Sequence, residues 1–396
     1  MLRSRALALD LDTRAALVTG TVTLPLTSPE WLYGLVVNSA GHVFMSQGNQ
    51  VLEATETDLS QSVAHDTPMD VGSMPGLRLS SDERLLYAVS RPPTSANNST
   101  LLVAIDTSTF QVVARQPLPD VPHSYRPYEL PDKSKLYVVG GEPAGPVTLD
   151  VFETVTHTAL KRITFDQPRL LGASAGESDP FAYAADTHTL YVGATHVVLA
   201  IDTQTDTIKQ VIRLDDMPKA IGLDPNQLTY TIAGALVYSP AERYLYIAHI
   251  DMSYISVYDV TTGRFLPFMI PVNGLFPTYL FPNADYSRLY AMNTLSDNIT
   301  VIDTASKSVE KVIDLHDSVP VPSPGAPFVA TQPTNCTVAV GATATFRSMG
   351  NNPRPTTVGP AIQWQVRTSG GSAWSNIPGA TTSAYSFVPA LADSGS

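Results

Sequence analysis

The 396-residue chain is predicted to be all-β: a seven-bladed β-propeller with one incomplete blade, followed by part of a second β domain. Three observations predict this fold class. Two short motifs alternate along residues 6–318, the unit that they mark contains four strand-like segments, and charged residues make up 15% of the chain. Sparse charge together with plentiful Thr, Ser, Pro and Gly indicates short strands and turns rather than helices.

The first motif is a Leu-Tyr-like pair inside a strand, usually preceded by a charged or polar turn. Its aromatic members lie 43 to 55 residues apart, a spacing typical of propeller blades. The pairs are Val43-Phe44, Leu86-Tyr87, Leu136-Tyr137, Leu190-Tyr191, Leu245-Tyr246 and Leu289-Tyr290.

The second motif is an apolar strand that ends in an acid and a threonine. The clear copies end at Asp106-Thr107, Asp202-Thr203 and Asp303-Thr304, and looser copies have their acids at Asp12, Glu56, Glu153 and Asp259. The acid precedes a hairpin, where it is expected to accept hydrogen bonds from turn N–H groups, so its presence requires no catalytic role. Seven copies that alternate with the first motif predict seven blades.

One complete unit is interpreted as four strands. In the last copy we expect them at 278–281, 288–293, 298–303 and 309–314. A four-stranded sheet that repeats every 40 to 50 residues is a propeller blade. A pair of stacked β-sandwiches is the alternative, but a sandwich gives no reason for one motif to repeat seven times.

The first unit contains two strand-like segments, at 7–12 and 15–26. We expect its inner two strands to come from sequence before Met1, because closure of the ring removes exposed strand edges. Asp10 and Asp12 interrupt the apolar run that a signal peptide needs. The chain is therefore expected to be a fragment of a longer protein.

The copy at 287–315 carries the repeat most fully. Leu289-Tyr290 is followed by Asn293, then by Val301-Ile302-Asp303-Thr304, and then by a Lys-x-Val-x-x-Val-Ile-x-Leu strand. This pattern resembles the YVTN-type β-propeller repeat, and the resemblance covers about residues 6–318. That family includes bacterial and archaeal surface-layer proteins, so the resemblance implies a surface or binding protein. Related propellers include lactonases and quinoprotein dehydrogenase subunits, so an enzymatic function stays open.

Residues 319–333 contain five prolines and are interpreted as a linker. In residues 334–396 we expect short strands at 337–340, 344–347, 362–366 and 384–388. Trp364 lies centrally in the third of these, and a buried Trp on such a strand is typical of an immunoglobulin-like sandwich. The run 377–387 and the segment 391–395 also resemble the end of bacterial Ig-like domains. A strand that follows in that family is missing here, so the sequence predicts a partial Ig-like β-sandwich.

Cys336 is the single cysteine of the chain, which excludes an intramolecular disulfide and a cysteine-based metal site. The Ig-like resemblance implies a disulfide between Cys336 and a cysteine beyond Ser396. Such a disulfide would indicate an oxidising, extracellular environment. A free, partly buried thiol is the alternative, and the longer gene sequence distinguishes the two.

The charge and hydropathy of the chain exclude two classes of partner. The formal net charge is −12, and an acidic surface repels phosphate backbones, so we expect no nucleic-acid ligand. No stretch approaches 18 consecutive apolar residues, so we expect no membrane insertion by this chain.

In a propeller, the loops that enter each innermost strand and leave each second strand form the usual ligand site. Here these loops carry aromatic side chains together with a few polar ones, which favours a protein, peptide or glycan ligand. The candidate ligand-binding residues are Trp31, Tyr33, Arg91, His123, Tyr125, Arg126, Tyr128, Glu142, Phe181, His196, His249, Asp251, Phe276, Tyr279 and Asn293. The alternative is that the aromatic side chains pack blade against blade and the polar ones are solvated.

His249 and Asp251 are weak candidates for metal ligands from one loop, and His123 and His196 would add others. The sequence has no His-x-x-x-His or His-Glu-x-x-His motif and no phosphate loop, nucleophile elbow or haem site, so we expect no cofactor. The sequence therefore favours a non-enzymatic extracellular or cell-surface binding protein. The alternative is a lactonase-like hydrolase or lyase with a metal in the channel, or a quinoprotein-dehydrogenase-like subunit.

Overall fold

The structure is a computed structural model, and it falls into two compact units, Met1–Ile212 and Arg213–Ser396. It describes residues 7–9, 18–21, 32–55, 58–68, 71, 74, 76–90, 100–118, 126–141, 146–166, 179–220, 232–250, 252–296, 298–314, 328–331, 338, 342–347, 349–351, 363–367, 373–381 and 384–390.

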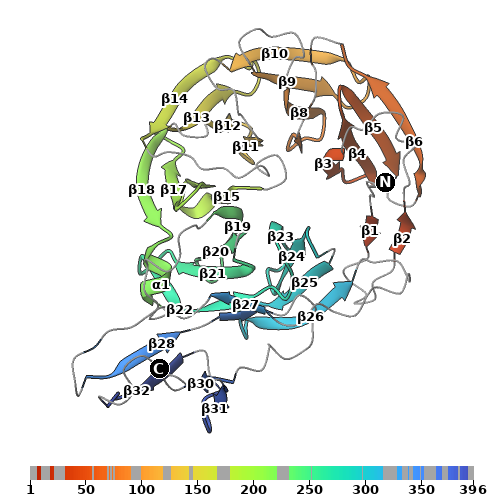
Figure 1. Cartoon of the computed structure of the whole chain (residues 1–396). Helices are drawn as coiled ribbons and strands as arrows, with labels where there is room; N and C mark the ends of the chain where they lie inside the picture. The colour runs from red at the N-terminus through yellow and green to blue at the C-terminus, as the bar shows by residue number, and fades with distance from the viewer. Residues whose placement is uncertain are drawn as a thin grey trace. The chain divides into compact units, whose positions relative to one another are not determined.

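The first unit contains four antiparallel sheets of four strands each, which we call blades 1 to 4. Their strands are β3 (Leu32–Val37), β4 (His42–Gln47), β5 (Gln50–Thr55) and β6 (Asp58–Asp66); β7 (Leu77–Leu79), β8 (Leu85–Ser90), β9 (Thr100–Asp106) and β10 (Val112–Leu118); β11 (Pro127–Glu129), β12 (Lys135–Gly141), β13 (Val147–Glu153) and β14 (Ala159–Phe165); and β15 (Phe181–Ala184), β16 (Thr189–Gly193), β17 (Val197–Asp202) and β18 (Thr207–Arg213). Within this unit, Figure 1 shows the fourth strand of each blade on the outer side and the first strand on the inner side.

The second unit contains blades 5 and 6, built in the same way. Their strands are β19 (Ala233–Ser239), β20 (Tyr244–His249), β21 (Tyr254–Asp259) and β22 (Arg264–Pro271); and β23 (Pro277–Pro282), β24 (Arg288–Asn293), β25 (Asn298–Asp303) and β26 (Ser308–Asp314). A short helix, α1 (Asp216–Ala220), precedes blade 5, and across the described residues no helix is long and apolar enough to cross a membrane. The four strands predicted for the last repeat are confirmed in blade 6.

The prediction of seven blades is wrong, because the described residues form six four-stranded sheets. The first repeat contributes a two-stranded sheet of β1 (Leu7–Leu9) and β2 (Val18–Thr21) instead of a blade. The acid-threonine motif marks the hairpin between the third and fourth strands of a blade. A copy of that motif is therefore no proof of the two inner strands, and a count of motifs overestimates the number of blades.

The partial Ig-like sandwich is not found in the described residues. After blade 6, the described chain forms three separate two-stranded sheets: β27 (Phe328–Thr331) with β29 (Met349–Asn351), β28 (Ala344–Arg347) with β32 (Ala384–Phe387), and β30 (Gln365–Val366) with β31 (Ser375–Asn376). The predicted strand at 344–347 is confirmed. The described strands of this region are, however, too short to form the two extended inner faces that a β-sandwich packs together. The domain bounds 6–318, 319–333 and 334–396 stay predictions.

The Leu-Tyr-like pairs are buried on both faces of their blades. Neighbouring residues of a strand point to opposite faces of a sheet, yet Leu136 and Tyr137 are both fully buried, as are Leu245 and Tyr246. Apolar clusters fill the spaces between blades 1 and 2, 2 and 3, 3 and 4, and 5 and 6. In blades 2 and 3, the second strands β8 and β12 contact a neighbouring blade on both sides, so both members of the pair are buried.

The acid-threonine motif holds the hairpins of blades 2, 3, 4 and 6. Asp106 accepts hydrogen bonds from the backbone N–H groups of Ser108 and Thr109, both at 2.9 Å. Its pKa is lowered to about 2, mainly by the hydrogen bond from the Ser108 hydroxyl. Thr107 donates its hydroxyl proton to the carbonyl of Glu83 at 2.9 Å, in the turn before the second strand. The acid thus caps one turn and the threonine ties it to another, as expected for a structural motif.

The hairpin between the third and fourth strands also joins neighbouring blades. In four blades it carries a non-glycine residue with a left-handed backbone, and these latch residues are Phe110, His157, Asp206 and Lys307. Each contacts the aromatic residue of the Leu-Tyr-like pair in the preceding blade. Between ring centroids, Phe110 lies 6.1 Å from Phe44, and His157 lies 5.8 Å from Tyr87. Asp206 accepts a hydrogen bond from the Tyr137 hydroxyl at 2.6 Å, and the Lys307 ammonium lies 5.7 Å from the Tyr246 ring centroid.

Candidate functional site

Several of the predicted site residues lie outside the described part of the chain. These are Trp31, Arg91, His123, Tyr125, Glu142 and Asp251, and Cys336 with its predicted disulfide is also outside it. Tyr33 belongs to β3, but its side chain is not described. The remaining candidates fall into two groups, one in each unit.

In the first unit, the structure brings Tyr128 on β11 against Phe181 on β15, with 5.2 Å between ring centroids. Both side chains are buried in the apolar cluster between blades 3 and 4. Arg126, just before β11, is also buried. The aromatic pair thus has the blade-packing contact that the sequence left open as an alternative.

Two residues that the sequence did not single out complete this group. The Arg78 guanidinium lies 4.7 Å from the Tyr128 ring centroid and donates a 2.8 Å hydrogen bond to Asp179 Oδ2. Burial opposes the charge on Arg78, but the Asp179 carboxylate overcomes it and raises the pKa of Arg78 above its ordinary value. The two residues are 101 positions apart in the sequence, so no local motif signals their contact.

His196 lies in the tight turn between β16 and β17, where its φ of 61° is left-handed. Its side chain is half-buried. Asp251 and His123 lie outside the described residues, so the predicted metal set stays a prediction. Throughout the ranges that the structure describes, no group of three or more His, Cys, Asp or Glu residues is arranged to hold a metal ion.

In the second unit, Asn293 at the end of β24 is the centre of a buried polar network. Its amide Nδ2 donates to Asn298 Oδ1 at 2.7 Å, to Thr300 Oγ1 at 2.9 Å and to the Val272 carbonyl at 3.3 Å. A Cβ on Gly274 would lie 2.5 Å from Asn293 Nδ2, so the chain approaches this network where a side chain would collide. The network therefore holds the connection from β22 into β23.

Two buried polar atoms beside this network have no hydrogen-bond partner among the described residues: Asn293 Oδ1 and Thr278 Oγ1. The register of β23 and β24 shifts between Pro277 and Tyr279, so Thr278 is the extra residue of a β-bulge opposite Asn293. Bulges are frequent where a strand must re-aim a side chain at a functional site. Both atoms lie at the inner end of blade 6, next to the aromatic residues that follow.

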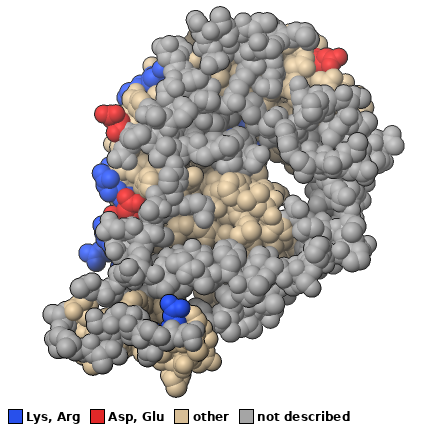
Figure 2. Space-filling view, in the orientation of Figure 1, with Lys and Arg blue, Asp and Glu red and all other residues tan. Residues whose placement is uncertain are grey.

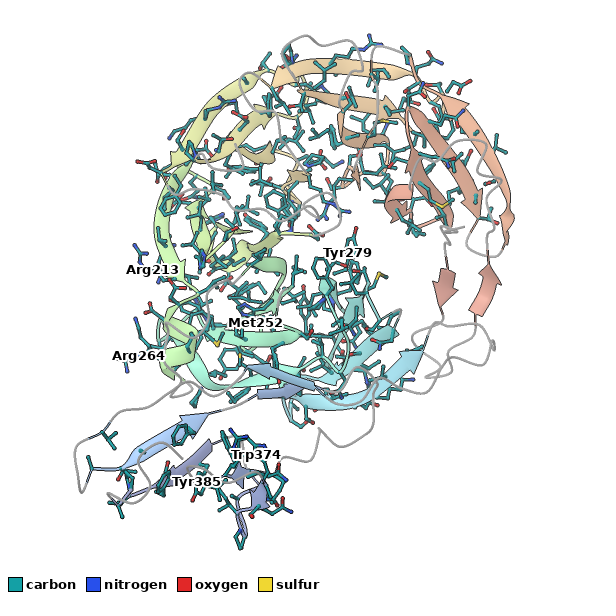
Figure 3. All side chains as sticks on the ribbon, in the orientation of Figure 1. Arg213, Met252, Arg264, Tyr279, Trp374 and Tyr385 are labelled. Carbon is teal, nitrogen blue, oxygen red and sulfur yellow. The ribbon has the colours of Figure 1, made fainter. Side chains whose placement is uncertain are left out.

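Tyr279 and Phe281 form an aromatic pair on β23, the innermost strand of blade 6. Their ring centroids lie 5.8 Å apart and their planes differ by 9°, so the rings are stacked. Tyr279 is half-buried, and Phe281 keeps 44% of its surface exposed. Figure 3 shows Tyr279 at the inner edge of its blade, and Phe276 precedes it in a left-handed conformation. Tyr279 is one of the predicted candidates, whereas Phe281 was not predicted from the sequence, and both keep solvent access.

His249, at the end of β20, is fully buried. Its Nε2 lies 2.7 Å from Ser256 Oγ, and Nδ1 has no hydrogen-bond partner among the described residues. Burial lowers the pKa of His249 to about 4. The side chain is therefore neutral at pH 7, and it belongs to the interior of its blade rather than to an open loop.

The surface in view carries both signs of charge. Figure 2 shows Lys and Arg side chains interspersed with Asp and Glu along one edge of the described surface. Charges of mixed sign give no extended field of one sign to attract a charged polymer.

No protein-family model matches the chain. Solved structures place its fold with the β-propellers. Hydrazine synthase of Kuenenia stuttgartiensis is similar with a TM-score of 0.56 and 17% sequence identity, over 75% of this chain and 88% of that chain. Dihydro-heme d1 dehydrogenase NirN in complex with DHE is similar with a TM-score of 0.51 and 16% identity, over 75% of this chain and 59% of that one. At such low identities the likeness shows the fold alone.

A curated protein shares a shorter segment with the chain. Endoglucanase C of Cellulomonas fimi is 35% identical over 108 residues, which are 27% of this chain and 9% of that protein. The chain thus spans a small part of this relative's length.

Proposed function

We propose that the chain is an extracellular or cell-surface binding protein of the YVTN-type repeat family that holds a glycan ligand at the inner strands of its propeller. The observation that carries this proposal is the stacked and partly exposed Tyr279–Phe281 pair on β23. Partly exposed aromatic faces on an inner strand give a ligand apolar contact, and the Tyr279 hydroxyl adds a polar group at the edge of its ring.

Two observations favour a glycan over a protein or a peptide as the ligand. The stacked rings of Tyr279 and Phe281, 5.8 Å apart, offer flat apolar faces that suit the C–H groups of a neutral sugar ring. The similarity to part of Endoglucanase C supports the same class, because that protein's name states an action on a glucan.

The enzymatic alternative has less support among the described residues. His249 was one of two weak metal candidates, and its Nε2 is already hydrogen-bonded to Ser256 within a fully buried site. The similar solved structures are named as enzymes, but at 17% and 16% sequence identity their similarity to this chain is one of fold alone.

Glycan-array screening followed by calorimetry of the whole chain tests the proposal. Tyr279→Ala is expected to weaken binding of the selected oligosaccharide at least tenfold, which corresponds to about 1.4 kcal/mol. Val113→Ala removes an apolar group that is 56% exposed on the outer strand β10 and is expected to leave affinity unchanged. Equal affinities of wild type and Tyr279→Ala would refute a glycan site on β23.

A further inference from the structure

The hairpin of β30 and β31 presents two chemically different faces. In its register, Gln365 pairs with Asn376 and Val366 with Ser375. Because side chains alternate along a strand, Gln365 and Arg367 share one face with Trp374 and Asn376. The contacts agree: Gln365 Nε2 donates to Asn376 Oδ1 at 2.8 Å, and the Arg367 guanidinium lies 5.0 Å from the Trp374 ring centroid.

One residue of the opposite face, Trp364, packs on its own part of the chain. The Trp364 ring lies 6.1 Å from the Tyr385 ring between centroids, and the Trp364 backbone bonds to Ala380 and Ile377. Trp364 is half-buried, whereas Val366 and Ser375 on the same face are exposed. Trp364 thus anchors the hairpin, and the face with Trp374 is directed to solvent.

Trp374 is 58% exposed, although Arg367 already lies over its ring. A packed aromatic side chain buries about 150–250 Å² of its surface. In Trp374 more than half of the residue's surface stays in contact with solvent. The exposed fraction implies that the indole face opposite Arg367 is open. Figure 3 shows Trp374 beside the hairpin, close to the ribbon of β30 and β31.

The neighbours of Trp374 on this face are an amide pair and a guanidinium, all exposed. Amides both donate and accept hydrogen bonds, and a guanidinium donates several in one plane. An indole face supplies apolar contact for the C–H groups of a sugar ring, while the polar groups suit its hydroxyls. A peptide ligand would favour apolar pockets for its side chains, whereas this face offers a single aromatic surface among polar groups.

We propose that Gln365, Arg367, Trp374 and Asn376 form a carbohydrate-binding strip on the β30–β31 hairpin. Trp374 stacks on a sugar ring, and the three polar side chains bind its hydroxyl groups. The proposal rests on the proposed glycan-binding function, but it places a contact on a different element from Tyr279. The two contacts would act on separate segments of a glycan or on separate chains.

Isothermal calorimetry of the whole chain with cellohexaose, a soluble glucan oligosaccharide, tests the strip. Trp374→Ala is expected to weaken binding at least tenfold, and Arg367→Ala about threefold to tenfold. Val388→Ala removes another exposed apolar side chain, 59% exposed, and is the matched control with unchanged affinity. Thermal melting of each variant shows that the exposed substitutions leave the fold intact.

The outcomes separate this strip from the propeller site. Loss of affinity in Trp374→Ala with wild-type affinity in Tyr279→Ala supports the strip and overturns the propeller site. The reverse result overturns the strip and leaves the propeller site standing. Absence of oligosaccharide binding by the wild-type chain, or capture of peptides by the Trp374 face in place of sugars, overturns the strip.

Discussion

His249 is the residue whose environment departs most from what its position in the sequence indicated. It follows a strand and precedes a turn, where a histidine is usually solvated, but its side chain is fully buried and bonded to Ser256. Burial lowers its pKa to about 4. A buried neutral histidine that must charge on unfolding makes stability depend on pH.

The sign of this dependence follows from the two pKa values. The unfolded chain binds the proton near the ordinary value of 6.5, and the folded chain binds it near 4. Stability is therefore full above about pH 6.5 and is lost as the pH falls toward 4, by about 1–3 kcal/mol. In His249→Gln this loss is expected to disappear. Urea unfolding of both proteins at pH 7 and pH 4.5 measures it, and an equal loss in the variant would contradict the assignment.

At the scale of the elements, the latch residues explain how blades of one unit stay in contact. Asp206 in the β17–β18 hairpin accepts from the Tyr137 hydroxyl and pairs with Lys135 at 2.7 Å. Burial, and then the bond to Asp206, raise the pKa of Tyr137. At Lys307 the latch residue carries the positive charge instead of the negative one. It forms an ion pair with Glu242, and Glu242 accepts a hydrogen bond from the Tyr246 hydroxyl at 2.7 Å.

Asp206→Ala is expected to cost about 2–4 kcal/mol of unfolding free energy, because it leaves the buried Tyr137 hydroxyl and Lys135 without their partner. Asp206→Asn is the matched control. Asparagine keeps an acceptor oxygen and tolerates the left-handed backbone, so its cost should be about 1 kcal/mol. Denaturant unfolding compares the two, and equal losses would show that the contact with Tyr137 contributes little.

The contacts that these hairpins make with other blades were not predictable from sequence. Phe110 and Asp206 have φ values of 55° and 52°, and each lies four residues after the acid of its motif, as Gly263 does. The Phe110 N–H donates to the Asp106 carbonyl at 2.9 Å within its own turn. The contacts with Phe44 and Tyr137, however, reach 66 and 69 positions back along the chain. Strand bounds, in contrast, depend on local pattern, and 288–293 and 298–303 were predicted as observed.

For the whole molecule, the acidic composition predicts how the chain behaves toward nucleic acid, and this prediction does not depend on any single site. With a formal net charge of −12 and charges of both signs mixed on the surface in view, the chain should not bind duplex DNA at physiological salt. An electrophoretic mobility shift assay checks this against a basic DNA-binding protein as positive control. A shift that weakens steeply with added salt would reveal a basic surface outside the described residues.

The sequence by itself determined the all-β class, the repeating unit and the strands of the last blade. These follow from local patterns: apolar pairs such as Leu289-Tyr290, and an acid that caps its own turn, such as Asp303. Only the tertiary structure decided the number of four-stranded blades and the contact of Arg78 with Asp179. It also decided that His249 is buried, whereas Tyr279 and Phe281 are partly exposed. The physical reason is that burial and pairing depend on which strands come together across a blade or between blades, and the spacing of motifs does not contain that information.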